Sequence, residues 1–381
     1  MGMNWKLGNS FAKYKRMTSM DFRYSSQDFV SEIPKDAKFS RFDQELRGRW
    51  DEAVEKGFFR YELGTLTTRV IEGPHRFVAQ LNEKRATDRR KPQEITSTKQ
   101  PYKPEEFNFN KVRPHEILME MQPVNLSYPS SNGITNGTIS SHTEREECIN
   151  GEGRGKYQVI INISPLEYGN VLLVPSPHLC QPQIATMEMI QIGVEAVLLS
   201  STSAFRIGYN SLCAYASVNH LHMHAYYVHH RLPVEYWPTK EVVEGRVHES
   251  IGWPAQGFLL QLNKENYWNG IRDVFTIVKH LQDKDIAHNM FFTRGSTLGP
   301  NPKEDGQTVR LFLWPRISSF GIKANDAFNG ACCELAGHLP IKLMQRYNDL
   351  TDEQCCELLE TCSLSAGDYT ALKKEIKDLF E

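Results

Sequence analysis

Residues 217–228 read Ser-Val-Asn-His-Leu-His-Met-His-Ala-Tyr-Tyr-Val and carry three histidines at alternate positions. A β-strand sends alternate side chains to opposite faces, and the aromatic and β-branched neighbours of these histidines are typical of a strand. We therefore predict a strand over residues 213–228 that presents His220, His222 and His224 on one face. The residues between the histidines are apolar and would pack on the other face.

Three interpretations of this face compete. It can be a polar strand edge, since the chain has 13 histidines and some clustering is expected. It can be a metal site, because His-x-His on a strand offers two nitrogens to zinc. It can also be a catalytic site in which one imidazole attacks phosphorus and its neighbours assist. The strict alternation with apolar residues disfavours the first interpretation, and the spacing does not separate the other two.

Composition narrows the class of protein. The chain has 381 residues, a formal net charge of −2, 40% hydrophobic and 24% charged residues. This near-neutral balance argues against binding nucleic acid by general electrostatics, and no apolar run has the length of a membrane span. The polar N-terminus has no signal-peptide pattern.

Eight cysteines include two adjacent pairs and no Cys-x-x-Cys, which favours a reducing compartment and no structural zinc. We predict a cytoplasmic protein that needs neither metal nor cofactor.

Periodicity predicts an α+β fold. An amphipathic helix is expected over 42–56, with Leu46, Trp50 and Val54 on one stripe. Strands over 157–163, 171–174 and 205–209 surround a helix over 184–199. The second half repeats this mixture, with a helix over 266–282, strands over 288–294 and 309–314, and helices over 351–361 and 367–380. The expected architecture is an antiparallel sheet with covering helices, followed by a second related α+β unit.

These elements suggest five segments. Residues 1–37 are interpreted as a mobile arm, 38–125 as an N-terminal α+β segment, and 126–155, rich in Ser, Asn, Thr and Gly, as a flexible insertion. Residues 156–238 form the unit that carries the histidines, and 239–381 form a C-terminal unit without them, which can wall one side of the site. The chain does not indicate an oligomeric state.

A basic, proline-containing stretch lies between Arg85 and Pro104, with cations at 85, 89, 90 and 91. We interpret it as a solvated loop; a segment that contacts phosphate is the alternative.

The histidine pattern, with Ser217 three residues before His220, resembles the signature of the histidine-triad superfamily of nucleotide hydrolases and transferases. The stretch Pro-Leu-Glu-Tyr-Gly-Asn-Val-Leu-Leu-Val-Pro at 165–175 is similar to the strand pair of that superfamily. Further stretches at 205–211, 291–295 and 311–316 resemble the branch formed by the animal GDP-D-glucose phosphorylases and the plant GDP-L-galactose phosphorylases. The similarity runs from about residue 42 to the C-terminus.

This resemblance implies an enzyme whose substrates are GDP-glucose and inorganic phosphate. It implies that His222 is the nucleophile and becomes a GMP-histidine intermediate, that His220 orients His222, and that His224 contacts the phosphate or the departing oxygen. It also implies that Ser217 and Asn210 bind substrate. The products would be GDP and glucose 1-phosphate, and ping-pong kinetics should follow.

The chain departs in two ways from the pattern of the transferases in this superfamily, and these differences keep other functions open. The uridylyltransferases and plant phosphorylases of the superfamily have Gln at the third histidine position, whereas His224 is the choice of the hydrolases. Hydrolysis of a nucleotide sugar is therefore an alternative. The uridylyltransferases also bind structural zinc through Cys-x-x-Cys, which this chain lacks. A metal hydrolase that uses the three histidines as ligands, and a non-catalytic guanine-nucleotide-binding regulator, are more distant alternatives.

Overall fold

One large sheet forms the centre of the molecule in the computed structural model, which describes residues 20–33, 38–124, 126, 156–303, 308–320 and 327–381. Its 11 strands run in the order β1-β4-β5-β6-β8-β7-β12-β13-β11-β10-β9. All neighbouring strands pair antiparallel except β1 and β4. The strands are β1 (Asp21–Tyr24), β4 (Ile117–Pro123), β5 (Tyr157–Ile161), β6 (Val171–Pro175), β8 (Met223–Tyr227), β7 (Phe205–Asn210), β12 (Ala287–Gly295), β13 (Thr308–Arg316), β11 (Phe258–Leu262), β10 (Val247–Ser250) and β9 (Thr239–Val243).

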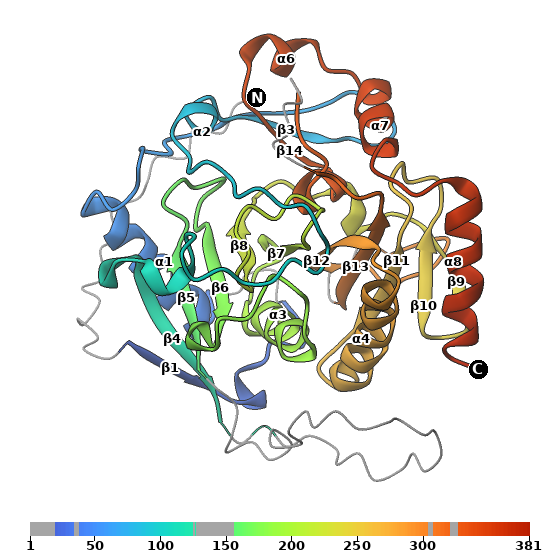
Figure 1. Ribbon diagram of the computed structural model, residues 1–381, viewed down its shortest axis with the longest axis horizontal. Coiled ribbons are helices and arrows are strands. Elements are labelled where there is room, and N and C mark those ends of the chain that lie inside the picture. The colour runs from blue at the N-terminus through green and yellow to red at the C-terminus, as the bar shows by residue number, and fades with distance from the viewer. Residues whose placement is uncertain (1–19, 34–37, 125, 127–155, 304–307, 321–326) are drawn as a thin grey trace.

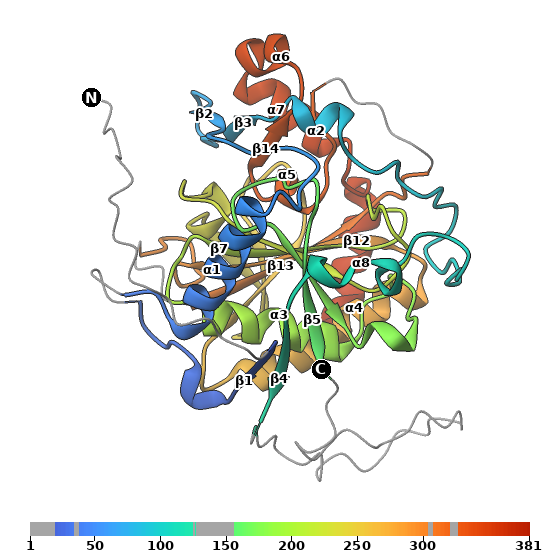
Figure 2. The ribbon, with the colours of Figure 1, turned by 90° about the vertical axis from the view of Figure 1, so that its left-hand side faces the viewer.

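Helices α3 (Met187–Leu199) and α4 (Tyr267–Asp283) lie side by side against one face of this sheet (Figure 1). The opposite face is covered by a small sheet of β14 (His338–Ile341), β3 (Val78–Leu81) and β2 (Thr67–Val70), as Figure 2 shows from the side. The remaining helices are α1 (Arg41–Glu55), α2 (Lys84–Thr87), α5 (Cys332–Leu335), α6 (Met344–Asp349), α7 (Asp352–Glu360) and α8 (Ala366–Asp378). Three layers result, with the large sheet in the middle.

The central strands are apolar on both sides because both of their faces are covered. In β12, Met290 and Phe292 pack in the core under α3 and α4, whereas Phe291 packs in the core under the small sheet. β8 follows the same alternation: Met223 and Ala225 belong to the first core and Tyr226 to the second. His224 therefore lies on the face that the small sheet covers.

The two halves of the chain share the large sheet. β7 of the first half pairs with β12 of the second half over Asn210↔Asn289 to Arg206↔Thr293. The segments predicted from the sequence as two related units thus meet in one continuous hydrogen-bonded ladder. The predicted α+β fold with covering helices is confirmed, as are the helices and strands expected on both sides of this junction.

Two of the predicted segments need comment. The interpretation of residues 1–37 as a mobile arm is wrong for residues 20–33, because Asp21–Tyr24 forms β1 and buries Phe22 and Tyr24 in the core. The rest of that arm and almost all of the predicted insertion, residues 127–155, lie outside the described residues. In the described part of the chain, every helix is too short or too polar to cross a bilayer.

Candidate active site

The histidine segment differs from the expected strand. The ladder of β8 begins at Met223, so the prediction of a strand over residues 213–228 is wrong for 213–222. The chain before it turns sharply, with positive φ angles at Cys213 and Tyr215. His224 stands on β8 between Leu172 of β6 and Gly208 of β7, while His220 and His222 lie in the segment that leads into the strand. The histidines nevertheless come together, with ring centroids of His222 and His224 5.2 Å apart.

His222 is held in one tautomer by hydrogen bonds to its Nδ1. This nitrogen lies 2.7 Å from the carbonyl oxygen of His220 and 2.9 Å from Oε1 of Gln183. Both neighbours are acceptors, so Nδ1 carries the proton and the lone pair of Nε2 is available for attack. The resemblance implied that His220 orients His222; the structure assigns that contact to the His220 backbone.

Gln183 is the positioning residue that the sequence analysis missed. Its Oε1 accepts the backbone N–H of His222 at 2.8 Å, and its Nε2 donates to the carbonyl oxygens of Asn210 and His222, each at 2.9 Å. These two donations fix the orientation of the amide, because Nε2 faces acceptors only. The side chain is 1% exposed. No local pattern marks it, since it lies 39 residues before His222 in a loop ahead of α3.

Burial keeps the triad neutral near pH 7. Desolvation lowers the pKa of His222 to about 4, although the hydrogen bond to the His220 carbonyl acts in the opposite direction. Desolvation also lowers the pKa of His220 to about 4. The pKa of His224 is lowered by burial, by His222 and by the positive charge of Arg85. A histidine nucleophile needs the neutral form, so these surroundings are compatible with the role predicted for His222.

His220 is anchored by the aromatic segment after the basic stretch. The backbone N–H of Phe109 donates to Nδ1 of His220 at 3.0 Å, and the Phe109 ring stacks on the His220 ring with centroids 5.4 Å apart. The same ring lies 4.9 Å from that of His222. Phe109 thus packs on two of the three histidines and forms one wall of the site.

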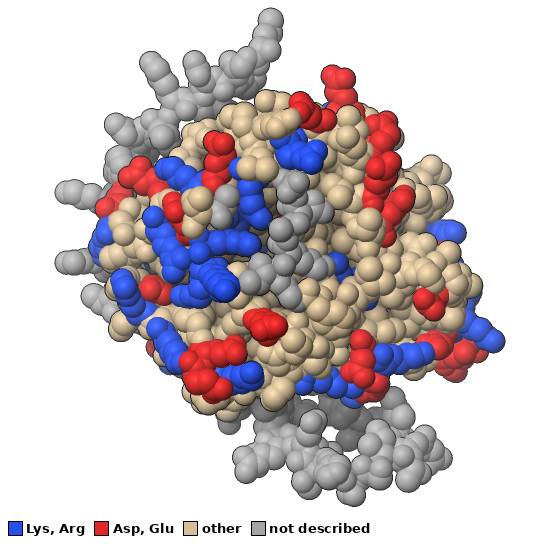
Figure 3. Space-filling view, turned by 45° about the horizontal axis from the view of Figure 1, so that its top comes forward, with Lys and Arg blue, Asp and Glu red and all other residues tan. Residues whose placement is uncertain are grey.

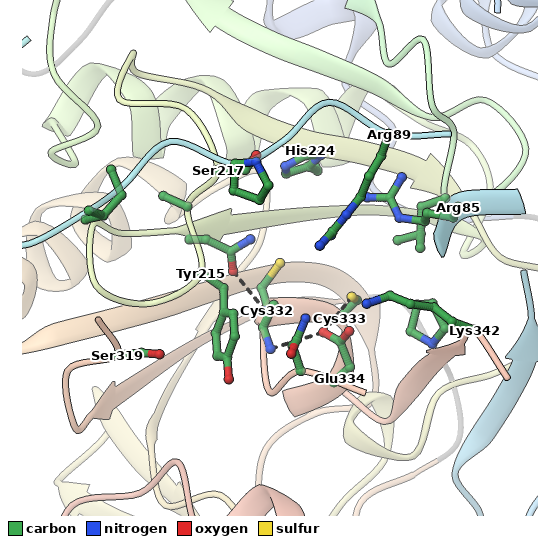
Figure 4. Close-up of a pocket in the computed structure, with 18 of the residues that line it drawn as sticks. Arg85, Arg89, Tyr215, Ser217, His224, Ser319, Cys332, Cys333, Glu334 and Lys342 are labelled. Atoms are coloured by element: carbon green, nitrogen blue, oxygen red, sulfur yellow. Dashed lines mark hydrogen bonds between the residues drawn. The ribbon is translucent and has the colours of Figure 1, made fainter. Parts of the chain in front are cut away.

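Two cavities meet at His224. The first, which we call the nucleophile cavity, contains His222, and its walls include the apolar side chains of Phe109, Ile163 and Leu172. The second, the interface cavity, is lined by residues of both halves of the chain and is drawn in Figure 4. His224 and Ser217 line both cavities.

The two expected substrate-binding residues occupy different surroundings. Ser217 lies at the junction of the cavities, as a phosphate-contacting residue requires. Asn210 lines the interface cavity, but its Oδ1 accepts from Asn289 Nδ2 at 2.6 Å and from the Cys332 N–H at 2.9 Å. This oxygen therefore ties β7 to the second half of the chain, and a substrate role for Asn210 stays a prediction.

The basic stretch contributes to the same cavities. Arg85 and Arg89 are half-buried and line both of them, so the interpretation of this stretch as a solvated loop is wrong for these two residues. Arg85 also donates to the carbonyl of Ser164. The alternative interpretation, a segment that contacts phosphate, fits their position.

A group of metal-ligating side chains lies elsewhere. One group of side chains in the described chain could hold a metal ion, because its ligand atoms lie within 4.8 Å of one another. It consists of His75, Asp352 and Cys356. Nδ1 of His75 already lies 2.7 Å from Asp352, and its ring stacks on Trp237. Burial raises the pKa of the Cys356 thiol to about 12. These contacts join the loop before β3 to α7, and the triad itself does not form such a set in the described chain.

Comparison with known proteins adds the family. Residues 41–226 match the family model described as GDPGP1-like, N-terminal domain, and residues 230–381 match GDPGP1-like, C-terminal domain. GDP-D-glucose phosphorylase 1 of Danio rerio is 39% identical over 93% of this chain and 97% of its own length. The Homo sapiens protein of the same name is 41% identical over 92% of this chain and 89% of its own. GDP-L-galactose phosphorylase 1 of Arabidopsis thaliana is 29% identical, covering 84% and 69%.

The fold also has a solved counterpart. Yeast Ap4A phosphorylase Apa2 in complex with Ap4A superimposes with a TM-score of 0.54 at 12% identity, over 85% of this chain and 97% of that chain. This likeness covers both halves of the molecule, so the continuous sheet is shared with a protein of distant sequence.

Proposed function

The chain belongs to the GDPGP1-like family, and we propose that it is a GDP-D-glucose phosphorylase, as its relatives are named. It transfers a guanylyl group from GDP-D-glucose to inorganic phosphate and yields GDP and glucose 1-phosphate. The observation that supports this most directly is the geometry of His222: a buried, neutral imidazole whose Nδ1–H is engaged and whose Nε2 is free to attack.

The reaction proceeds in two displacements at the α-phosphorus. In the first, Nε2 of His222 attacks, the bond from the α-phosphorus to the bridging oxygen breaks, and glucose 1-phosphate departs. The enzyme then holds GMP through a phosphorus–nitrogen bond. In the second, an oxygen of inorganic phosphate attacks the same phosphorus, the bond to His222 breaks and GDP is released. Two in-line steps of this kind replace one slow direct transfer.

His224 and Ser217 flank the reacting phosphorus. His224 stands next to His222 at the mouth shared by the two cavities. Its neutral imidazole can donate one N–H to the bridging oxygen as charge develops there. The hydroxyl of Ser217, which lines the same two cavities, can donate to a non-bridging oxygen. Both contacts strengthen as negative charge builds up, so they assist each displacement.

Hydrolysis is the second candidate, because His224 replaces the Gln of the related transferases. In that case water attacks the guanylyl-His222 and GMP is the product. The metal alternative is disfavoured by geometry, since in the described chain the three triad rings do not converge as ligands. Counting GDP against GMP at increasing phosphate concentration separates the first two functions: GMP alone at every concentration would establish a hydrolase.

The decisive test is to trap the intermediate. Wild-type protein incubated with GDP-D-glucose without phosphate should gain one GMP, lost in acid and mapped to His222 by mass spectrometry. His222→Asn should gain none. His288→Asn is the matched control, because His288 is also buried, also has a pKa lowered to about 4 and also places Nδ1 near the carbonyl two residues before it. An adduct that persists in His222→Asn would remove the proposed mechanism.

A further inference from the structure

The interface cavity gathers positive charge from distant parts of the chain. Arg85 lies on α2, Arg89 follows that helix, and Lys342 follows β14 in the second half of the chain. Figure 4 shows the side chains of Arg89 and Lys342 reaching into the cavity from different elements, and Figure 3 shows that Lys and Arg gather on the face of the molecule that carries α2.

Within the described chain, neither Arg89 nor Lys342 has an ion pair. Burial and the charges of Arg89 and Arg85 lower the pKa of Lys342, and burial and Arg85 lower the pKa of Arg89, while the Glu334 carboxyl acts in the opposite direction on both. One carboxyl group lines the cavity, that of Glu334, and burial raises its pKa to about 7. Like charges held together in a half-buried cavity favour an anionic ligand.

The position of the cavity relative to His222 indicates which anion it receives. An in-line displacement places the leaving oxygen on the side of phosphorus opposite the nucleophile. His222 lines the nucleophile cavity only, and His224 separates it from the interface cavity. A nucleotide whose base packs on the apolar wall at Phe109 would therefore direct its leaving group past His224 and toward Arg89 and Lys342.

We propose that Arg85, Arg89 and Lys342 form one subsite that first holds the phosphate of the departing hexose 1-phosphate and then the attacking inorganic phosphate. This inference rests on the proposed function. The same three cations contact a phosphate group in both displacements. In the first it is the phosphate of the leaving hexose 1-phosphate, and in the second it is the attacking inorganic phosphate. Glu334, Asn329 and Ser319 line the cavity beyond them and offer hydrogen-bonding groups suited to hexose hydroxyls.

This subsite also decides between phosphorolysis and hydrolysis. Water is far more abundant than phosphate, so phosphate attacks the guanylyl-His222 intermediate ahead of water only if it is bound beside the guanylyl group. His224, the residue shared with hydrolases, does not supply that binding, whereas a cluster of cations does. Residues outside the histidine segment therefore set the acceptor, which explains how a triad with a third histidine serves a phosphorylase.

The test compares Lys342→Gln and Arg89→Gln with Lys84→Gln. Lys84 lies on α2, lines neither cavity, and donates to the Glu62 carbonyl, so its variant removes one charge from the same region. For the first two variants we expect the KM for phosphate to rise roughly 10- to 100-fold, as for one lost charge-assisted contact. The fraction of GMP among the products should rise with it, and Lys84→Gln should resemble wild type.

Inhibition by GMP provides the second measurement, because GMP has no leaving group and fills the nucleophile cavity alone. Its inhibition constant should stay within about twofold of wild type in Lys342→Gln, a change too small for a lost contact. An unchanged GDP-to-GMP ratio in both Lys342→Gln and Arg89→Gln would overturn the subsite, as would equal losses of GMP and phosphate binding. Failure of the proposed function is seen separately, as the absence of a guanylyl adduct in the wild-type protein.

Discussion

The depressed pKa of His222 predicts an unusual pH dependence for the first half-reaction. An imidazole with its ordinary pKa of 6.5 is roughly 3% neutral at pH 5. With the pKa lowered to about 4, roughly 90% stays neutral at that pH. Attack on GDP-D-glucose needs the neutral form, so burial of His222 preserves about a 30-fold advantage at pH 5 over an ordinary histidine.

The measurement is the release of glucose 1-phosphate in a single turnover without inorganic phosphate. Omitting phosphate matters because phosphate itself titrates near pH 7 and would mask the enzyme's own groups. The second-order rate constant of this half-reaction at low GDP-D-glucose, which reports groups of the free enzyme, should be nearly constant from pH 8 to about pH 5 and fall below that. Circular dichroism at each pH, with return of samples to pH 7.5, controls for acid unfolding.

A profile that falls tenfold per pH unit from pH 6.5 downward would refute this reasoning, because it would mean that the nucleophile titrates as an exposed histidine. Gln183→Met provides a second check. Methionine keeps the volume of Gln183 but removes its contacts to His222 and Asn210. The rate should then drop at every pH, because an Nδ1 with one acceptor fewer fixes the tautomer less well.

The remaining predictions concern stability. Gly208→Ala should lower the unfolding free energy by about 1–3 kcal/mol in urea, because a Cβ there would overlap Sγ of Cys332. Gly48→Ala, in open space on α1, should instead raise it by about 0.5–1 kcal/mol. Arg206→Met should cost about 3–5 kcal/mol by leaving Glu235, 2.6 Å away, as a buried unpaired charge. Finally, stability should fall as pH drops from 6.5 toward 4, since unfolding lets the buried His220 and His222 bind protons. Calorimetry should show a loss of up to about 3 kcal/mol for each of these two histidines, and a flat profile would contradict it.

Local patterns predicted the regular elements well because their faces are simple. Helix α1 buries Leu46 and Trp50 of its predicted stripe, but the prediction is wrong for Val54, which is exposed while Ala53 is buried. The strands on both sides of the sheet junction are buried runs close to the expected length. Strand β1 was also visible in principle, since Asp21–Tyr24 alternates exposed and buried residues. It was overlooked because the strand has four residues and stands in an otherwise polar segment.

The histidine segment shows where period-two alternation misleads. An extended loop satisfies the same alternation as a strand, and residues 217–222 are held by partners remote in sequence rather than by a neighbouring strand. Asn219 N–H donates to Gln93 Oε1, Leu221 N–H to the Gln181 carbonyl and His222 N–H to Gln183. No local signal shows which of these backbone groups will find a side-chain acceptor, so the start of β8 was misplaced, although the rings of His222 and His224 still lie together.

The continuous sheet explains why the half of the chain without the histidine triad is part of this site. Gln183 holds His222 and donates to the Asn210 carbonyl, and the Asn210 side chain accepts from Asn289 on β12 and from the Cys332 N–H. A chain of hydrogen bonds therefore runs from His222, the proposed nucleophile, into the second half. That half also supplies Lys342 to the interface cavity. The position of His222 and the placement of the Lys342 charge in the interface cavity thus depend on the same junction between the halves. Separating the halves at β7 and β12 would therefore loosen both at once.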